Sequence, residues 1–130
     1  MMNTNKEVGR WGEETAASYL KRKGYSIVDR NFYTPEGEID LIAFYEDNGE
    51  KILVFVEVKT RTSQKFGYPE EAFTRKKWEH ALKAIDRYLQ DHPDFEDAWQ
   101  VDVIAVQRLS ADKPPDIEHF ENVVMNNDRE

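Results

Sequence analysis

The sequence lacks both cysteine and long apolar runs. Without thiols the chain forms neither a disulfide framework nor a thiolate metal site. With no run of about 18 apolar residues we expect no membrane-spanning helix, and the N-terminus has no apolar stretch typical of a signal peptide. These features predict a cytoplasmic protein with no membrane partner. At 130 residues, the chain most simply forms one domain with a core of its own.

Several common catalytic signatures are also missing. There is no Ser-His-Asp arrangement, no Gly-rich phosphate loop and no internal repeat. The three histidines, His80, His92 and His119, stand singly in polar stretches of sequence. We therefore expect none of them to be a metal ligand or a catalytic base.

The chain has no excess of positive charge. Its formal net charge is −8, which by itself argues against nucleic acid as a partner, because phosphate contacts dominate the affinity for nucleic acids. The imbalance is confined to one end, however. Residues 1–90 contain 15 Lys+Arg and 15 Asp+Glu, whereas residues 91–130 contain 3 and 11. The charge therefore does not exclude nucleic acid, but it predicts weak, salt-sensitive binding.

The most informative stretch is residues 37–61, where two hydrophobic segments flank Asn48-Gly49. Asn-Gly between alternating apolar residues is a strong signal for a β-hairpin with a two-residue turn. Such a turn places Asp47 opposite Glu50 and fixes the register of the whole hairpin. In that register Asp40 lies opposite Glu57.

Opposed carboxylates destabilise a sheet, so this pairing needs an explanation. A divalent cation held by Asp40 and Glu57 would remove the conflict, and hard ions such as Mg²⁺ prefer carboxylate oxygens. Lys59, two residues beyond Glu57, would lie opposite Glu38 in the same register. The alternative is a solvated ladder of opposite charges, which would contribute little to stability.

The second segment of the hairpin has the pattern of a central strand. Its even positions, Ile52 to Val58, are apolar throughout. Its odd positions begin with Leu53 and Phe55 and then change to Glu57, Lys59 and Arg61. A strand with two apolar faces is buried between layers, and its polar end would open onto a cleft. There Lys59 could position a water or stabilise charge on a phosphate.

Several separated motifs resemble the YraN family of small bacterial proteins. That family is grouped with endonucleases of the restriction-endonuclease-like PD-(D/E)XK superfamily and is similar to archaeal Holliday junction resolvases. The resemblance runs from about residue 9 to about residue 106. The matching stretches are Gly12-Glu13, Arg30-Asn31, GEIDLIA at 37–43, VFVEVKTR at 54–61, FGYPEEA at 66–72, Lys77 and Asp102-Val103-Ile104.

The resemblance implies roles for further residues. Glu13, at the edge of an apolar helical stripe, would support the metal shell through water, although an acid there also suits the first turn of an ordinary helix. Arg61, Gln64 and Lys77 would contact nucleic acid. The family usually has a basic residue where this chain has Gln100. That departure leaves the role of the nearby Asp102 open.

The elements expected along the chain form an α/β domain, with a mixed central sheet between helices. We expect helices over residues 6–23 and 70–90, and strands over 25–32, the two arms of the hairpin and 99–109, with an edge strand over 119–124. This order fits the restriction-endonuclease-like fold that the resemblance implies. Residues 1–112 would form the nuclease domain, and residues 113–130 an edge segment and acidic tail.

The sequence therefore predicts an endonuclease dependent on Mg²⁺ or Mn²⁺ that hydrolyses phosphodiester bonds, with branched or structured DNA favoured over RNA. Asp40 and Glu57 would hold the metal, with the Val58 carbonyl as a further ligand. A homodimer would suit a junction resolvase, which cuts two strands symmetrically. Two alternatives stay open: a nucleic-acid-binding module with weak or lost nuclease activity, and an interaction domain that uses the acidic residues 91–130.

Overall fold

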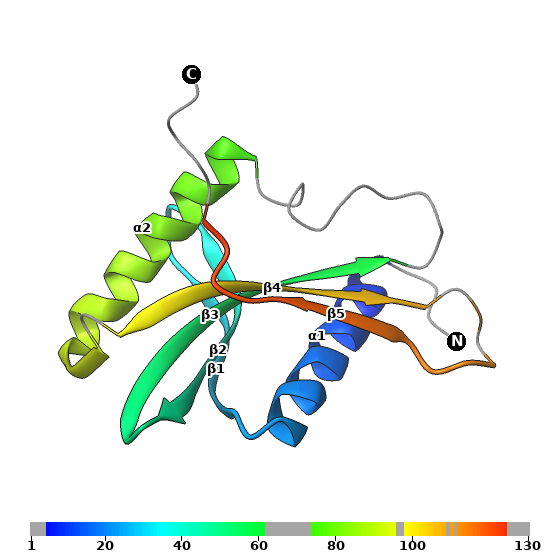
Figure 1. The fold of residues 1–130 in the computed structure, drawn as a ribbon. Helices are drawn as coiled ribbons and strands as arrows, with labels where there is room; N and C mark the ends of the chain where they lie inside the picture. Colours follow the sequence, from blue (N-terminus) through cyan, green and yellow to red (C-terminus); the bar gives the residue numbers. More distant parts are fainter. Residues whose placement is uncertain (1–4, 62–73, 96–97, 109, 111, 125–130) are drawn as a thin grey trace.

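The computed structural model describes residues 5–61, 74–95, 98–108, 110 and 112–124. Along the chain lie the helix α1 (Asn5–Arg22), the strands β1 (Ser26–Tyr33), β2 (Glu38–Asp47) and β3 (Glu50–Arg61), and the helix α2 (Arg75–Asp91). The 3-10 helix η2 (Pro93–Phe95) and the strands β4 (Trp99–Gln107) and β5 (Asp116–Phe120) follow (Figure 1).

The five strands form one mixed sheet in the order β1-β2-β3-β4-β5. Only β3 and β4 run parallel; the other neighbours are antiparallel. A parallel pair needs a long crossover connection, and α2 provides it. The prediction of an α/β fold with a mixed sheet flanked by helices is confirmed, and the arrangement is compatible with a restriction-endonuclease-like fold.

The sheet is buried on both faces around β3. Leu53 and Phe55 lie in one cluster with the α2 residues Trp78, Ile85 and Tyr88. The alternate residues Val54 and Val56 lie in a second cluster, with Ala16, Ala17 and Leu20 of α1. All four β3 side chains are at most 1% exposed. The central position predicted for this strand is therefore correct.

The hairpin register is the one expected from its turn. Pairing runs from Asp47 with Glu50 to Leu41 with Val56. Asn48 and Gly49 have φ values of 55° and 86°, the left-handed conformation that a type I′ turn requires.

Two elements differ from the expected ranges by more than two residues at a boundary. The helix α2 begins at Arg75 rather than at residue 70, because Thr74 is an extended N-cap residue whose side chain accepts a hydrogen bond from the Lys77 amide. The strand β5 begins three residues and ends four residues before the expected 119–124, and its pairing with β4 includes Asp116 opposite Gln107. In the described part of the chain, neither helix has the length and apolar character needed to span a membrane.

A buried polar network joins α1, β4 and β5. Asp102 is fully buried, and its carboxylate accepts hydrogen bonds from Gln100 Nε2 at 3.0 Å, His119 Nε2 at 2.7 Å and the Asn122 amide at 2.9 Å. The other ring nitrogen of His119 lies 3.1 Å from the hydroxyl of Tyr19. Although His119 stands in a polar stretch of sequence, its side chain is only 4% exposed, and its polar partners are buried with it.

The network also answers the question that the sequence left open about Asp102. Gln100 donates to the Asp102 carboxylate through its side-chain amide. A neutral imidazole with its hydrogen on Nε2 donates to Asp102 and leaves Nδ1 free to accept from Tyr19. Asp102 therefore has a structural role that connects the outer strand to the sheet and to α1.

We expect His119→Ala to lower the free energy of unfolding by about 3–5 kcal/mol, because it leaves a buried carboxylate without its closest donor. Urea denaturation at pH 7 measures the change. The matched control is Glu118→Ala, an exposed position on the same strand, which should change stability by less than about 0.5 kcal/mol. Equal losses in the two variants would contradict a stabilising role for the network.

Candidate metal site

The β2–β3 ladder ends where the two candidate carboxylates begin. The last pair of facing residues in the β2–β3 register is Leu41 with Val56. The next residues on the two strands are Asp40 and Glu57. Asp40 is 8% exposed, and one of its oxygens accepts a hydrogen bond of 2.8 Å from the Val58 amide. The side chain of Glu57 is 18% exposed. The hairpin therefore brings two carboxylates into one largely buried place.

Burial and mutual repulsion make these carboxylates reluctant to ionise. Desolvation, with the nearby charge of Glu57 as the next cause, raises the pKa of Asp40 to about 8, and the Val58 hydrogen bond opposes this shift only in part. Burial also raises the pKa of Glu57, opposed by the charges of Lys77 and Lys59. A group of buried acids with this property is electrostatically suited to a bound cation.

Two lysines lie beside the acids. The ammonium of Lys77, on the first turn of α2, is 3.6 Å from a Glu57 oxygen and is half-exposed. Burial lowers the pKa of the Lys59 ammonium, and the charges of Arg61 and Lys77 lower it further. The structure therefore brings Lys59, Arg61 and Lys77 together at the acidic pair. Lys77, expected to contact nucleic acid, is here the ion-pair partner of Glu57.

Glu13 lies on α1 at the rim of the same acidic group. It accepts a side-chain hydrogen bond from Asn31, and burial raises its pKa. Its charge also contributes to the raised pKa of Asp40. Glu14, in contrast, is exposed and pairs with Arg30 at 2.8 Å. Of the two neighbouring acids, Glu13 is the one that acts on the candidate site.

Glu38 is a member of the site that sequence reasoning did not assign. Its charge raises the pKa of Glu13, Asp40 and Glu57 alike. It lines a cavity of about 310 Å³ shared with Glu13, and another of about 180 Å³ shared with Glu57 and Lys77. The sequence did contain a signal for Glu38: it stands two residues before Asp40 and so points to the same face of the strand. The expected hairpin register, however, gave Glu38 only the role of a partner for Lys59.

Two glycines allow the helices to approach the site. A Cβ atom at Gly12 would collide with the Thr60 side chain, so α1 lies closely against the end of β3. A Cβ atom at Gly37 would come within 2.8 Å of the His80 carbonyl oxygen of α2. These close contacts explain how Glu13 and Lys77 reach the ends of the central strands.

The remaining predicted residues contribute less. The Arg61 guanidinium donates to the Thr60 carbonyl at 3.1 Å, and Arg61 is half-buried. Gln64 lies outside the described residues. Within those residues there is no group of three or more His, Cys, Asp or Glu side chains placed to hold a metal. Mg²⁺ commonly takes one or two carboxylates and completes its shell with water and phosphate, so Asp40 and Glu57 fit this ion.

Comparison with known proteins identifies the family. The model of the uncharacterised protein family UPF0102 matches residues 12–106. The chain belongs to this family. It is 47% identical to a UPF0102 protein of Syntrophomonas wolfei, over 91% of this chain and 97% of the relative. It is 39% identical to one of Beutenbergia cavernae, over 94% of this chain and 99% of the relative.

The UPF0102 match spans the whole candidate site. It begins at Gly12, beside Glu13, and extends past Asp102. Every residue of the acidic group therefore belongs to the part of the chain that defines the family. The names of these relatives state no activity, so the function has to be argued from the site.

The raised pKa of Asp40 predicts a specific pH dependence of stability. A folded-state pKa above the ordinary value of 3.8 means that the folded protein holds this proton more tightly than the unfolded chain. Stability is then lost as the pH rises from about 4 towards 8. We expect Asp40→Asn to remove this loss. In metal-free buffer its Tm should exceed that of the wild type at pH 8 by at least about 4 °C, roughly the effect of 1 kcal/mol.

The control for this experiment is Asp47→Asn, an exposed acid on the same strand. Its Tm difference from the wild type should stay constant between pH 4 and pH 8. If the Tm difference for Asp40→Asn is equally constant, then Asp40 is not a repelled, buried acid.

Proposed function

We propose that this protein is an endonuclease dependent on Mg²⁺ or Mn²⁺ that hydrolyses phosphodiester bonds, with DNA favoured over RNA. One observation carries the proposal: Asp40 and Glu57 are held together in a buried place, with raised pKa values, beside Lys59. Evidence of a second kind comes from the α/β fold, which is compatible with that of restriction endonucleases. The motifs shared with the YraN family point to the same chemistry.

Asp40 and Glu57 would hold the cation, with Glu13 acting through water. When bound, the cation would polarise the phosphate and lower the pKa of a coordinated water. The hydrogen bond from the Val58 amide orients the Asp40 carboxylate and limits its rotation. Ligation by the Val58 carbonyl stays a prediction.

Lys59 would act on the attacking water. Its lowered pKa makes the neutral amine more accessible than in an exposed lysine, so Nζ can accept a proton from the attacking water. As an ammonium, the same group stabilises the negative charge that develops on the phosphate. Arg61, two residues beyond Lys59 on β3, would bind a neighbouring phosphate, and a contact of Gln64 with nucleic acid stays a prediction.

Cleavage assays test this proposal directly. The purified protein is incubated at low salt with a four-way junction, a flap, duplex DNA, single-stranded DNA and a structured RNA, in Mn²⁺, Mg²⁺ or EDTA. We expect metal-dependent cleavage of a DNA substrate. Asp40→Asn and Lys59→Met should each reduce its rate by about 10²–10⁴-fold, while Asp47→Asn leaves it unchanged.

The outcomes separate the three functions considered. DNA binding without cleavage under any condition would favour a binding module. Absence of both, together with capture of a basic protein partner by residues 91–130, would favour the interaction domain. Cleavage that persists in folded Asp40→Asn protein would contradict the assigned site.

The ion pair between Lys77 and Glu57 yields a prediction about metal affinity. Because the Lys77 ammonium neutralises the carboxylate that would bind the cation, Lys77→Met should tighten Mn²⁺ binding about two- to fivefold, the value of a half-exposed ion pair. Calorimetric titration measures the affinity. Lys76→Met, an exposed neighbour on α2, is the matched control for the change in net charge. Weaker Mn²⁺ binding by Lys77→Met would instead show that Lys77 supports the metal-bound state.

A further inference from the structure

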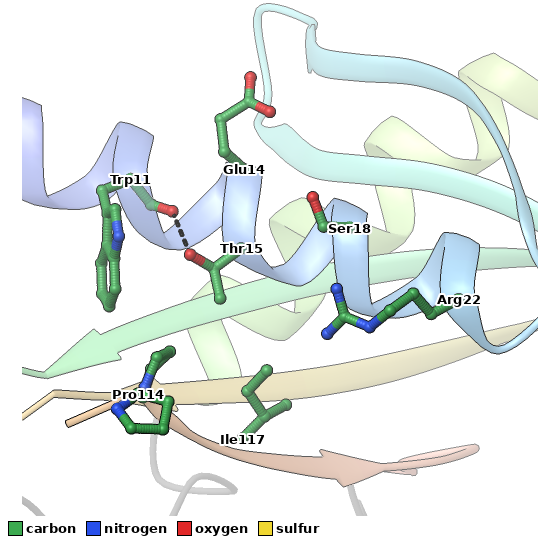
Figure 2. Close-up of a pocket in the computed structure, with 8 residues that line it drawn as sticks. Trp11, Glu14, Thr15, Ser18, Arg22, Pro114 and Ile117 are labelled. Carbon is green, nitrogen blue, oxygen red and sulfur yellow. Dashed lines mark hydrogen bonds between the residues drawn. The ribbon is translucent and has the colours of Figure 1, made fainter.

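A separate pocket lies between α1 and β5, and it shares no residue with the candidate metal site. Its volume is about 400 Å³, within the range of small-molecule sites. Figure 2 shows α1 above it and β5 below it, with Trp11 and Pro114 at one end and Arg22 at the other. Ile117 of β5 forms the floor between them.

The aromatic end of the pocket is held in place by the protein. The Arg108 guanidinium lies over the Trp11 ring, 5.4 Å from its centroid. The backbone carbonyl of Trp11 accepts a hydrogen bond of 2.8 Å from the hydroxyl of Thr15. Trp11 is half-buried, and its ring hangs from α1 above Pro114 (Figure 2). A planar ligand could therefore stack on a surface that is already positioned.

The other end of the pocket offers unused hydrogen-bond donors. Arg22 and Ser18 are both exposed, and across the described ranges neither side chain has a hydrogen-bond or ion-pair partner within the protein. Figure 2 shows the Arg22 side chain extending back along α1 towards Ser18. The acid at the rim, Glu14, points away from the floor and is already paired with Arg30. The charge that faces the pocket is therefore positive.

An aromatic wall, an apolar floor and an anion-binding end together define the ligand. We propose that this pocket binds a nucleotide, with its base against Trp11 and Pro114 and its phosphate at Arg22 and Ser18. Base stacking on an aromatic ring tolerates any base, and the planar guanidinium suits phosphate oxygens. Ser18 lies seven residues after Trp11, about 10 Å along the helix axis, a length comparable to one nucleotide from base to phosphate.

The nucleotide has two sources with the same chemistry. It is either free in solution or the 5′-terminal residue of a DNA strand. In the second case the pocket would hold one end of the substrate, and that case rests on the proposed nuclease function. Arg22 also suits the dipole at the end of α1, but this role requires neither the unpaired Ser18 hydroxyl nor the aromatic wall.

Nuclear magnetic resonance titration of the ¹⁵N-labelled full chain in EDTA tests the proposal. The probes are AMP, adenosine, inorganic phosphate and a short single-stranded DNA with a 5′-phosphate, and the reporter is the indole N–H of Trp11. We expect AMP or the oligonucleotide to shift this resonance, and Arg22→Gln to weaken the binding by about tenfold or more. Binding of AMP identifies a free nucleotide, and binding of the oligonucleotide alone identifies a strand end.

Lys21→Gln is the matched control, since it removes the same charge from an exposed neighbour that does not line the pocket. It should change the affinity by no more than about twofold. Equal weakening by Lys21→Gln, inorganic phosphate binding as tightly as AMP, or no shift with any nucleotide probe would overturn the proposal. The experiment contains no metal, and Asp40→Asn protein should bind the nucleotide normally. Failure of the nuclease and failure of the pocket are therefore distinguishable.

Discussion

The candidate site depends on the burial of β3 on both faces. Leu53, Val54, Phe55 and Val56 are almost completely excluded from water, with α2 covering one side and α1 the other. These apolar residues fix β3 in the middle of the sheet. The polar residues that follow on the same strand therefore cannot all move out into solvent. Glu57 is consequently held near Asp40, close enough for its charge to raise the pKa of the Asp40 carboxyl.

Groups around the two carboxylates lower the free-energy cost of burying them. The Val58 amide and the ammonium groups of Lys59 and Lys77 each offset part of the repulsion. The pKa of both acids nevertheless stays raised, chiefly because burial disfavours their charged forms. A protein that needed only a stable sheet would be more stable with neutral side chains at these positions, because a buried charge is costly. Strain of this kind is typical of functional sites.

The two polar clusters described above, one around Asp102 and one around Asp40, differ in how well their charges are satisfied. The Asp102–His119 network is saturated, with donors for both carboxylate oxygens. Its geometry fits a structural role that attaches β5 to the sheet. The group around Asp40 instead keeps buried acids whose pKa is raised, and it borders two cavities. This contrast is why we assign function to the second group.

Local patterns in the sequence were sufficient for the hairpin. The Asn48-Gly49 turn and the alternation of apolar residues determined its register, the central position of β3 and hence the meeting of Asp40 with Glu57. The approximate extents of both helices also followed from apolar stripes. The start of α2 was misjudged, because the cap at Thr74 gives a weaker signal than the residues before it.

Contacts between distant segments were decided only by the tertiary structure. Tyr19 meets His119 across 100 residues of chain, and Lys77 meets Glu57 through the packing of α2 on the sheet. The pocket between α1 and β5 likewise exists only once β5 has joined the sheet and α1 has packed on it. Residue periodicity states which face of an element is buried, but not which other element covers it. That choice depends on the parallel pairing of β3 with β4 and on the close approach of the helices.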